Sequence, residues 1–142
     1  MGNIQHDAAD PRALQRFQHM TLIQLTALAA PIVETALKKL PAPLRSLASA
    51  IPVHFEALPD ADLVAEGFEV DILGLFTGSP HGHDYNDGHQ MPAEIILFLE
   101  NLWDLAEGDE AVFRDEVRIT YLHELGHYFG WDEDDLADRE LD

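Results

Sequence analysis

The sequence predicts an α+β domain in which a small sheet is backed by helices. Apolar residues recur at helical spacing near both ends of the chain, whereas short stretches with strand patterns lie between them. This order of helices, strands and a long final helix is typical of the α+β class. With 142 residues and 46% apolar content, the chain is long enough for a hydrophobic core, and we expect one domain over residues 1–142.

The first expected helix is amphipathic. Asp10 and Pro11 are suited to its N-cap and first turn. Pro31 is expected to break or kink it, with a second helical piece to about Leu40 and a short helix over residues 44–50. Residues 1–32 are therefore interpreted as an added N-terminal helix. Its apolar face comprises Leu14, Phe17, Thr21, Leu25, Leu28 and Ile32.

Three strands are expected in the middle of the chain. Residues 53–57 alternate between apolar and polar, as in a half-buried strand. Residues 70–76 form a second candidate. Residues 94–99 are apolar nearly throughout, which predicts a central strand. Pro59–Asp62 is expected to form a turn, and residues 81–90, which contain no aliphatic side chain, a loop.

The last helix is expected to begin near Asp109 and to end at Gly130, because glycine readily adopts the left-handed conformation that terminates helices. A short helical turn is expected to start at Asp104–Glu107. We therefore predict a long helix that carries any motif located between Asp109 and Gly130.

Composition excludes several classes of partner and site. The net charge is −19, from 27 acidic residues against 8 Lys and Arg, so we expect neither nucleic acid nor an anionic membrane as a partner. There is no cysteine, which excludes disulfides and Cys-ligated zinc. The N-terminus lacks the basic and apolar regions of a signal peptide. We expect a soluble cytoplasmic protein.

The sequence His-Glu-Leu-Gly-His at residues 123–127 is the most informative motif. Residues four apart on a helix differ by only about 40° in direction, so His123 and His127 can share one metal ion. Zinc lowers the pKa of a bound water toward about 7, and Glu124 is placed to accept its proton during attack on a carbonyl. With this composition, the spacing is expected by chance only about 0.04 times per chain. The alternative is a helix whose histidines are merely partly exposed.

A zinc site of this type needs a third protein ligand. Gly130 follows His127 by three residues and can turn the chain back toward the metal. In the longer motif of this kind, the third ligand lies three residues beyond that glycine, which here is Glu133. A carboxylate can bind zinc, so Glu133 is the favoured third ligand. The neighbouring acids remain rivals, namely Asp132, Asp134 and Asp135.

The chain resembles a family of small prokaryotic zincin-like proteins described as minimal zinc metallopeptidases. The resemblance rests on the sequence HELGHYFGWDEDDL near the C-terminus and, less specifically, on residues 72–78 and 92–98; it extends from about Val33 to the end. It implies a compact zincin core in which a strand lies over the helix that carries the histidines. It also implies a zinc ion held by His123 and His127, Glu124 as general base, and an acid at Glu133.

The chain departs from one larger branch of zincins, the metzincins. Metzincins have a methionine-containing turn beneath the metal, downstream of the motif. Seven residues follow Asp135, and none is methionine; Met91 precedes the motif. We therefore expect a pared-down zincin.

Other residues with chemical potential fit simpler interpretations. The loop with His81, His83, Asp84 and His89 has a metal-like composition, but a rim loop near the substrate is the better interpretation. Tyr85 within it is a weaker candidate for contact with an oxyanion. His54, Trp103 and Trp131 are expected to be structural. If strand 94–99 were an edge strand, it would be able to pair with an extended peptide, although its apolar character argues for burial.

The leading functional hypothesis is a zinc-dependent peptidase acting on a peptide or protein substrate. One alternative is a non-catalytic metal-binding or protein-interaction module on the same scaffold. Another is an acidic binding protein that takes up no metal. An open metal coordination position would favour the enzyme, and a fourth protein ligand would favour the module.

Overall fold

A three-stranded mixed sheet forms the centre of the structure. The computed structural model describes residues 19–79 and 92–130 of the chain. Within these ranges, β1 (Val53–Glu56), β2 (Gly74–Thr77) and β3 (Glu94–Phe98) are arranged in the order β1-β3-β2. β1 is parallel to β3, whereas β2 is antiparallel to it. The prediction of an α+β fold is therefore confirmed, and β3 is central as its apolar sequence indicated.

The register of the strands separates the two faces of the sheet. Ile95 of β3 lies between Val53 of β1 and Phe76 of β2. All three residues belong to the hydrophobic core or pack against it. Ile95 and Leu97 are completely buried, because alternate residues of a strand point to the same face. This face of the sheet is the one that the helices cover.

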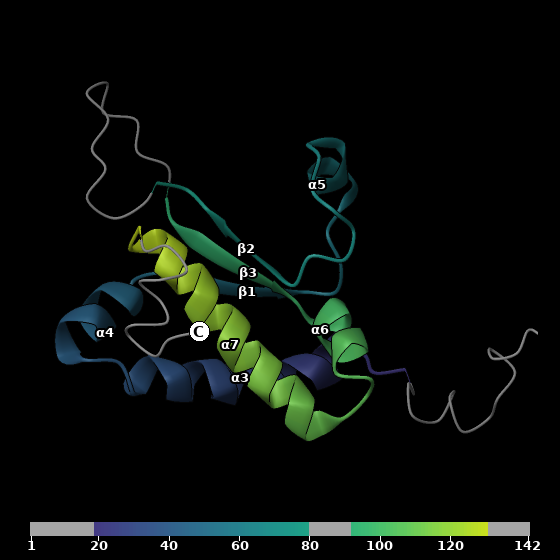
Figure 1. Cartoon of the computed structure of the whole chain (residues 1–142), viewed down its shortest axis with the longest axis horizontal. Coiled ribbons are helices and arrows are strands. Elements are labelled where there is room, and N and C mark those ends of the chain that lie inside the picture. Colours follow the sequence, from purple (N-terminus) through teal and green to yellow (C-terminus); the bar gives the residue numbers. More distant parts are fainter. Residues whose placement is uncertain (1–18, 80–91, 131–142) are drawn as a thin grey trace, which may run out of the picture.

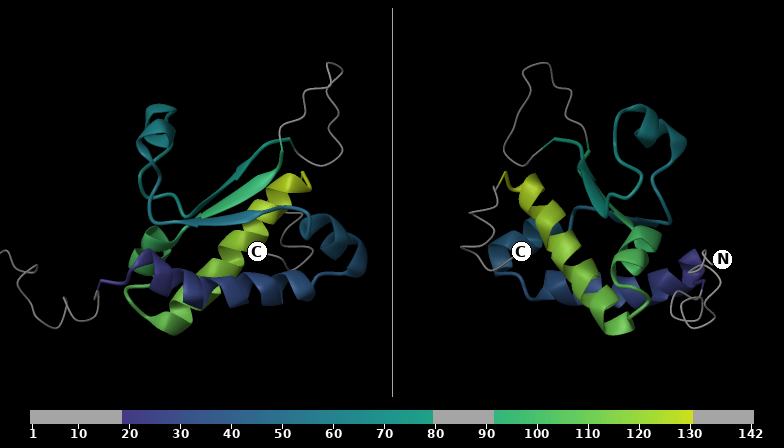
Figure 2. Two further views of the ribbon diagram at one scale, coloured as in Figure 1. Left: turned by 180° about the vertical axis from the view of Figure 1, so that it is seen from behind. Right: turned by 45° about the vertical axis from the view of Figure 1, so that its right-hand side comes forward.

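The two longest helices, α3 (Leu22–Lys38) and α7 (Glu110–Tyr128), lie on the same side of the sheet (Figures 1 and 2). They contact each other, and α7 also contacts β2 and β3. The short helices α4 (Ala42–Ala48) and α6 (Leu99–Leu105) flank this layer, whereas α5 (Ala61–Ala65) projects away from it (Figure 2). No helix in the described ranges has the length and apolar character needed to cross a membrane.

Pro31 was predicted to break or kink the first helix, and the break does not occur. α3 continues through Pro31 to Lys38. Pro31 and Ala27 are both exposed, so the Ala27 carbonyl, which loses its helical donor at Pro31, can be hydrated by water. The opposite side of the helix is held in the core by a buried stripe of Leu25, Ala29, Val33 and Ala36. Burial on one side therefore outweighs the local preference for a break.

The described start of α3 is set by a capping box. The Gln24 backbone N–H donates to Thr21 Oγ1 at 3.1 Å, and the Thr21 N–H donates to Gln24 Oε1 at 2.9 Å. This reciprocal pair satisfies two of the free donors at the helix end. α3 therefore begins at Leu22, later than the predicted start at Asp10 and Pro11, and residues 1–18 lie outside the described ranges.

Two further boundaries differ from the predictions. The second strand begins at Gly74 instead of Val70, and Val70 is 62% exposed, so it takes no part in the buried pattern that defines the strand. α6 ends at Leu105 instead of starting near Asp104, because Leu99 and Leu102 are fully buried and extend the helix from the end of β3. The predicted turn at Pro59–Asp62 contains the start of α5, which Asp60 caps.

Candidate active site

α7 carries the motif and is built as the sequence predicted. The side chain of Asp109 accepts a hydrogen bond from the Val112 N–H at 3.1 Å and thereby caps the first turn. At the other end, Gly130 has a φ of +75°, a left-handed conformation that glycine adopts without strain. Between them, a stripe of side chains anchors the helix in the core, namely Phe113, Val117, Thr120, Tyr121, Leu122 and Leu125.

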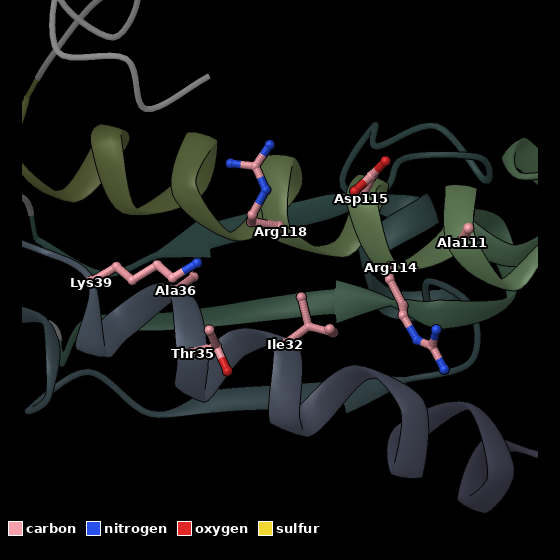
Figure 3. A pocket seen from close by; sticks show the side chains of 8 residues that line it. All are labelled: Ile32, Thr35, Ala36, Lys39, Ala111, Arg114, Asp115 and Arg118. Atoms are coloured by element: carbon pink, nitrogen blue, oxygen red, sulfur yellow. The ribbon is translucent and has the colours of Figure 1, made fainter.

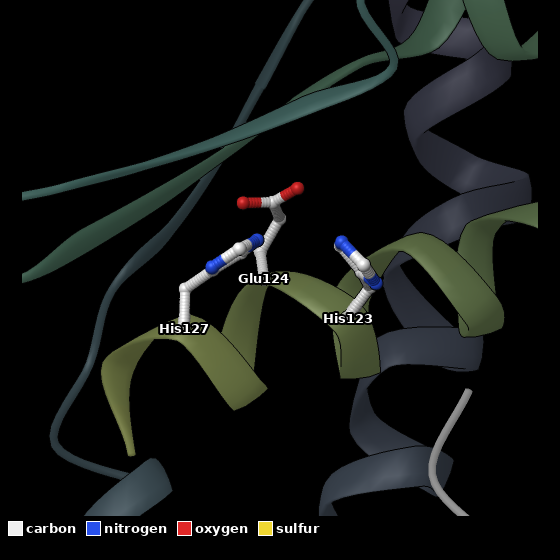
Figure 4. Close-up of side chains that lie close together, drawn as sticks. All are labelled: His123, Glu124 and His127. Atoms are coloured by element: carbon white, nitrogen blue, oxygen red, sulfur yellow. The ribbon is translucent and has the colours of Figure 1, made fainter. Parts of the chain in front are cut away.

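The three side chains of the motif converge on one side of α7. Ligand atoms of His123, Glu124 and His127 all lie within 4.8 Å of one another. The two imidazole rings have centroids 4.9 Å apart and stand nearly perpendicular to each other, at 81°. Figure 4 shows the three side chains projecting from the same side of the helix. The predicted pairing of the two histidines across one helical turn is present in the structure.

This donor set fits a divalent metal such as zinc. Imidazole nitrogens and carboxylate oxygens are ligand types that zinc accepts. His127 is exposed and His123 is partly exposed, so an ion has access to both rings. Within the described ranges, this is the one group of three or more potential metal-binding side chains. The residues present therefore fit a metal site, with His123 and His127 as its described nitrogen donors.

Glu124 lies in an environment that favours its neutral form more than water does. Burial raises the pKa of its carboxyl group, and His127, His123 and a hydrogen bond from the Phe76 backbone N–H oppose this effect. Phe76 belongs to β2, so the catalytic candidate is tied to the strand that lies beside α7. A carboxylate with a raised pKa is a better proton acceptor than one in water.

Gly74 allows β2 to approach α7 closely. A Cβ atom at this position would lie 2.8 Å from Thr120 Cγ2 and 3.2 Å from Glu124 Cγ. Such contacts are too short for an ordinary side chain, so only glycine fits here without a shift of its neighbours. Sequence reasoning did not identify Gly74 as part of the site, although an isolated glycine inside a predicted strand is a signal of close backbone approach.

Several predicted site residues lie outside the described ranges. These are Glu133 with its rivals Asp132, Asp134 and Asp135, the loop residues His81, His83, Asp84, Tyr85 and His89, and also Trp131 and Met91. The third metal ligand therefore stays a prediction. The structural role expected for His54 is supported by a hydrogen-bond contact between neighbouring strands, in which His54 Nε2 lies 2.7 Å from Glu94 Oε1.

A family model for zincin-like metallopeptidases matches residues 48–142, more than half of the chain. The chain belongs to the zincin-like metallopeptidase family. No curated protein matches the sequence. The match begins at residue 48, later than the resemblance from Val33 that the motifs suggested, and it leaves α3 outside. A single domain over residues 1–142 with an added N-terminal helix stays a prediction.

Membership in the zincin-like family agrees with the geometry of the site. The family implies a metal ion, typically zinc, and this zincin-like chain has a His–Glu–His group able to hold one. The resemblance placed a strand over the histidine-bearing helix, and both β2 and β3 contact α7. Trp103 has the packing role expected of it, because its ring stands edge-on to Phe113 with centroids 5.4 Å apart.

Proposed function

We propose that the chain is a zinc-dependent peptidase. His123 and His127 are metal ligands, Glu133 is the third ligand, and Glu124 is the general base. The observation that carries this proposal is the convergence of three side chains within 4.8 Å, beside a strand with one free edge. The zincin-like family match supports the same reaction class.

Different residues of the candidate site would have different roles in hydrolysis. A zinc ion held by His123, His127 and Glu133 would supply Lewis acidity, which would make a water molecule acidic enough to react near neutral pH. Glu124 accepts a proton from that water and can later return it to the leaving amine. The Phe76 N–H holds the Glu124 carboxylate in place.

The substrate class follows from charge and from the sheet. A net charge of −19 repels nucleic acid and anionic membranes but not peptides. β2 pairs with β3 on one side only within the described ranges, and a free strand edge can pair with an extended peptide. The same role proposed for strand 94–99 is excluded, because β3 has a partner on each side. A cytoplasmic location is supported by the absence of cysteine.

Glu124→Gln tests the mechanism. The amide keeps the shape of the side chain but cannot accept a proton, so kcat/KM should fall by about 100-fold or more. Zinc affinity should remain close to the wild-type value, because both histidines are intact. The measurements are zinc binding by calorimetry and cleavage of a synthetic peptide library followed by mass spectrometry.

The controls separate the enzyme from the non-catalytic module. Glu34→Gln makes the same chemical change at an exposed position of α3 and should leave cleavage unchanged. Removal of zinc by a chelator should abolish cleavage, and added zinc should restore it. If the wild-type protein binds zinc but cleaves no peptide in the library, the metal-binding or interaction module becomes the better account.

A further inference from the structure

A pocket of about 370 Å³ adjoins His123 and Glu124. Its volume lies within the range of small-ligand sites, about 300–1,000 Å³. One wall is the segment that leads into β2, and the other is the middle of α7. Because the pocket opens beside the proposed base, a substrate group that fills it must lie next to the bond that is cleaved. The lining comprises Ile72, Leu73, Gly74, Glu116, Ile119, Thr120, His123 and Glu124.

The β2 side of this pocket is held in place by Asn101 of α6. The Asn101 side-chain amide donates to the Val70 carbonyl at 2.8 Å and to the Ile72 carbonyl at 2.9 Å. These bonds fix the backbone just before Gly74, although Val70 is exposed and the segment is not yet part of the strand. The wall formed by Ile72 is therefore preorganised, which lowers the entropy lost on binding.

Charge in the pocket comes from acids at both ends. Glu124 lies at the catalytic end, and Glu116 lies seven residues before His123, which corresponds to about 10 Å along the helix axis. No lysine or arginine is among the lining residues of the described ranges. Within the same ranges, Glu116 forms no ion pair with a basic side chain. Ile72 and Ile119 provide apolar surface between the two acids.

Some of the basic residues of the chain border a different pocket. A cavity of about 400 Å³ between α3 and α7 is bordered by Lys39, Arg114 and Arg118 (Figure 3). These are three of the eight Lys and Arg residues in the chain. The pocket at the candidate active site thus attracts cations, whereas this second pocket places cations of its own at its rim.

We infer that the pocket beside His123 and Glu124 receives a lysine or arginine side chain of the substrate, with Glu116 as its acceptor. This inference rests on the proposed peptidase function. The aliphatic stem of the basic residue packs on Ile72 and Ile119, and its charged end reaches Glu116. Histidine is too short to span two helical turns, and an acidic side chain is repelled by both glutamates. The enzyme therefore cleaves next to a long basic residue.

A binding experiment tests the pocket without requiring catalysis. Three capped tripeptides carry arginine, norleucine or glutamate between two alanines, and each is titrated into the full-length, metal-free protein and followed by NMR. The arginine peptide should bind roughly tenfold more tightly than the norleucine peptide, with amide shifts at Gly74 and Ile119. The glutamate peptide should bind most weakly.

Two variants locate the source of this preference. Glu116→Gln should reduce arginine affinity to the norleucine level and leave norleucine binding unchanged. Glu116→Lys should make the glutamate peptide the preferred one. Asp115→Asn is the matched control, because it removes one negative charge at the adjacent exposed position, outside this pocket. It should retain the arginine preference. Circular dichroism checks that each variant retains its helices.

A cleavage profile of the zinc-loaded protein separates the two proposals. If arginine is preferred in binding but no peptide is cleaved, the peptidase function fails and the pocket assignment stands. If peptides are cleaved without a basic residue beside the cut, the pocket assignment fails and the peptidase function stands. Equal binding of the arginine and norleucine peptides, or an unchanged preference in Glu116→Gln, overturns the pocket assignment.

Discussion

Glu124 packs against the backbone of Gly74, a residue that has no side chain. The closest atoms to a Cβ placed at Gly74 are Thr120 Cγ2, Glu124 Cγ and Leu97 Cδ2, at 2.8, 3.2 and 3.2 Å. Two of these three atoms belong to α7, and one belongs to the proposed base. The position of the Glu124 carboxylate therefore depends on a residue 50 positions earlier in the chain.

Gly74→Ala should displace Glu124 more than it disturbs the metal ligands. We expect kcat/KM to fall by roughly tenfold or more, since small misplacements of catalytic groups are costly. Stability should fall by about 1–3 kcal/mol because the new methyl group overpacks the contact. Zinc affinity should change little, because no histidine is among the nearest atoms. Peptide cleavage, urea unfolding and zinc calorimetry measure these three effects.

A second substitution tests the physical cause. Thr120→Ser removes the Cγ2 atom that would lie 2.8 Å from the methyl group introduced at position 74. In combination with Gly74→Ala, it should recover part of the lost stability, whereas activity should stay low because the contact with Glu124 persists. Wild-type activity in Gly74→Ala alone would show that the close approach does not position the base.

At the scale of elements, α7 was predictable because its signals are local. The cap at Asp109, the helical spacing of apolar residues and the terminal Gly130 all lie within one segment. His123, Glu124 and His127 are adjacent on that helix, so their convergence follows from helix geometry alone. The central position of β3 was similarly encoded in its own apolar sequence.

The remaining parts of the site depend on segments that are distant in sequence. Gly74, the Phe76 N–H and the amide of Asn101 act on the site only because β2 and α6 are brought beside α7. Apart from the isolated glycine at position 74, no local pattern indicates these contacts. The same limitation explains why the strand was predicted to begin too early, since residues 70–72 have a strand-like composition but the Val70 and Ile72 carbonyls accept hydrogen bonds from the Asn101 side chain.

α3 provides a test of how tertiary packing overrides propensity. Pro31 lies inside the helix on its exposed side, where it costs a backbone hydrogen bond without gaining a core contact. Pro31→Ala should therefore raise the free energy of unfolding by about 1–3 kcal/mol. Urea unfolding measures the change. Thr35→Ala, also exposed on α3, serves as the control and should change stability by less than about 0.5 kcal/mol. A less stable Pro31→Ala protein would contradict this account.

At the scale of the whole molecule, Tyr121 links stability to alkaline pH. The residue is 1% exposed, and burial raises the pKa of its hydroxyl group from 10.0 to about 12. As the pH rises, the unfolded chain therefore loses the Tyr121 hydroxyl proton at a lower pH than the folded chain does. The contribution of the protonated Tyr121 to the free energy of unfolding is fully present below pH 10 and is lost as the pH rises through the folded pKa of about 12.

Tyr121→Phe should remove this part of the pH dependence. The difference in unfolding free energy between the wild-type protein and the variant should be constant from pH 7 to 9. As the pH approaches 12, the unfolding free energy of the wild-type protein should fall by about 2 kcal/mol relative to that of the variant. Lysine and arginine titrations are common to both proteins and cancel in the difference. Parallel stability curves over the whole range would contradict the assignment.

The hydrogen bond from the Phe76 N–H to Glu124 also bears on self-association. The unpaired edge of a strand can act as a template for the strand of another molecule. Within the described ranges, β2 pairs with β3 along one of its two edges. At its other edge, the Glu124 carboxylate accepts a hydrogen bond from the Phe76 N–H, which an uninterrupted second strand would need. A negative charge at this edge further opposes the approach of another chain that also carries −19. The proposed general base thereby opposes the pairing of an uninterrupted strand from a second molecule, while the rest of this edge stays available to a short extended peptide.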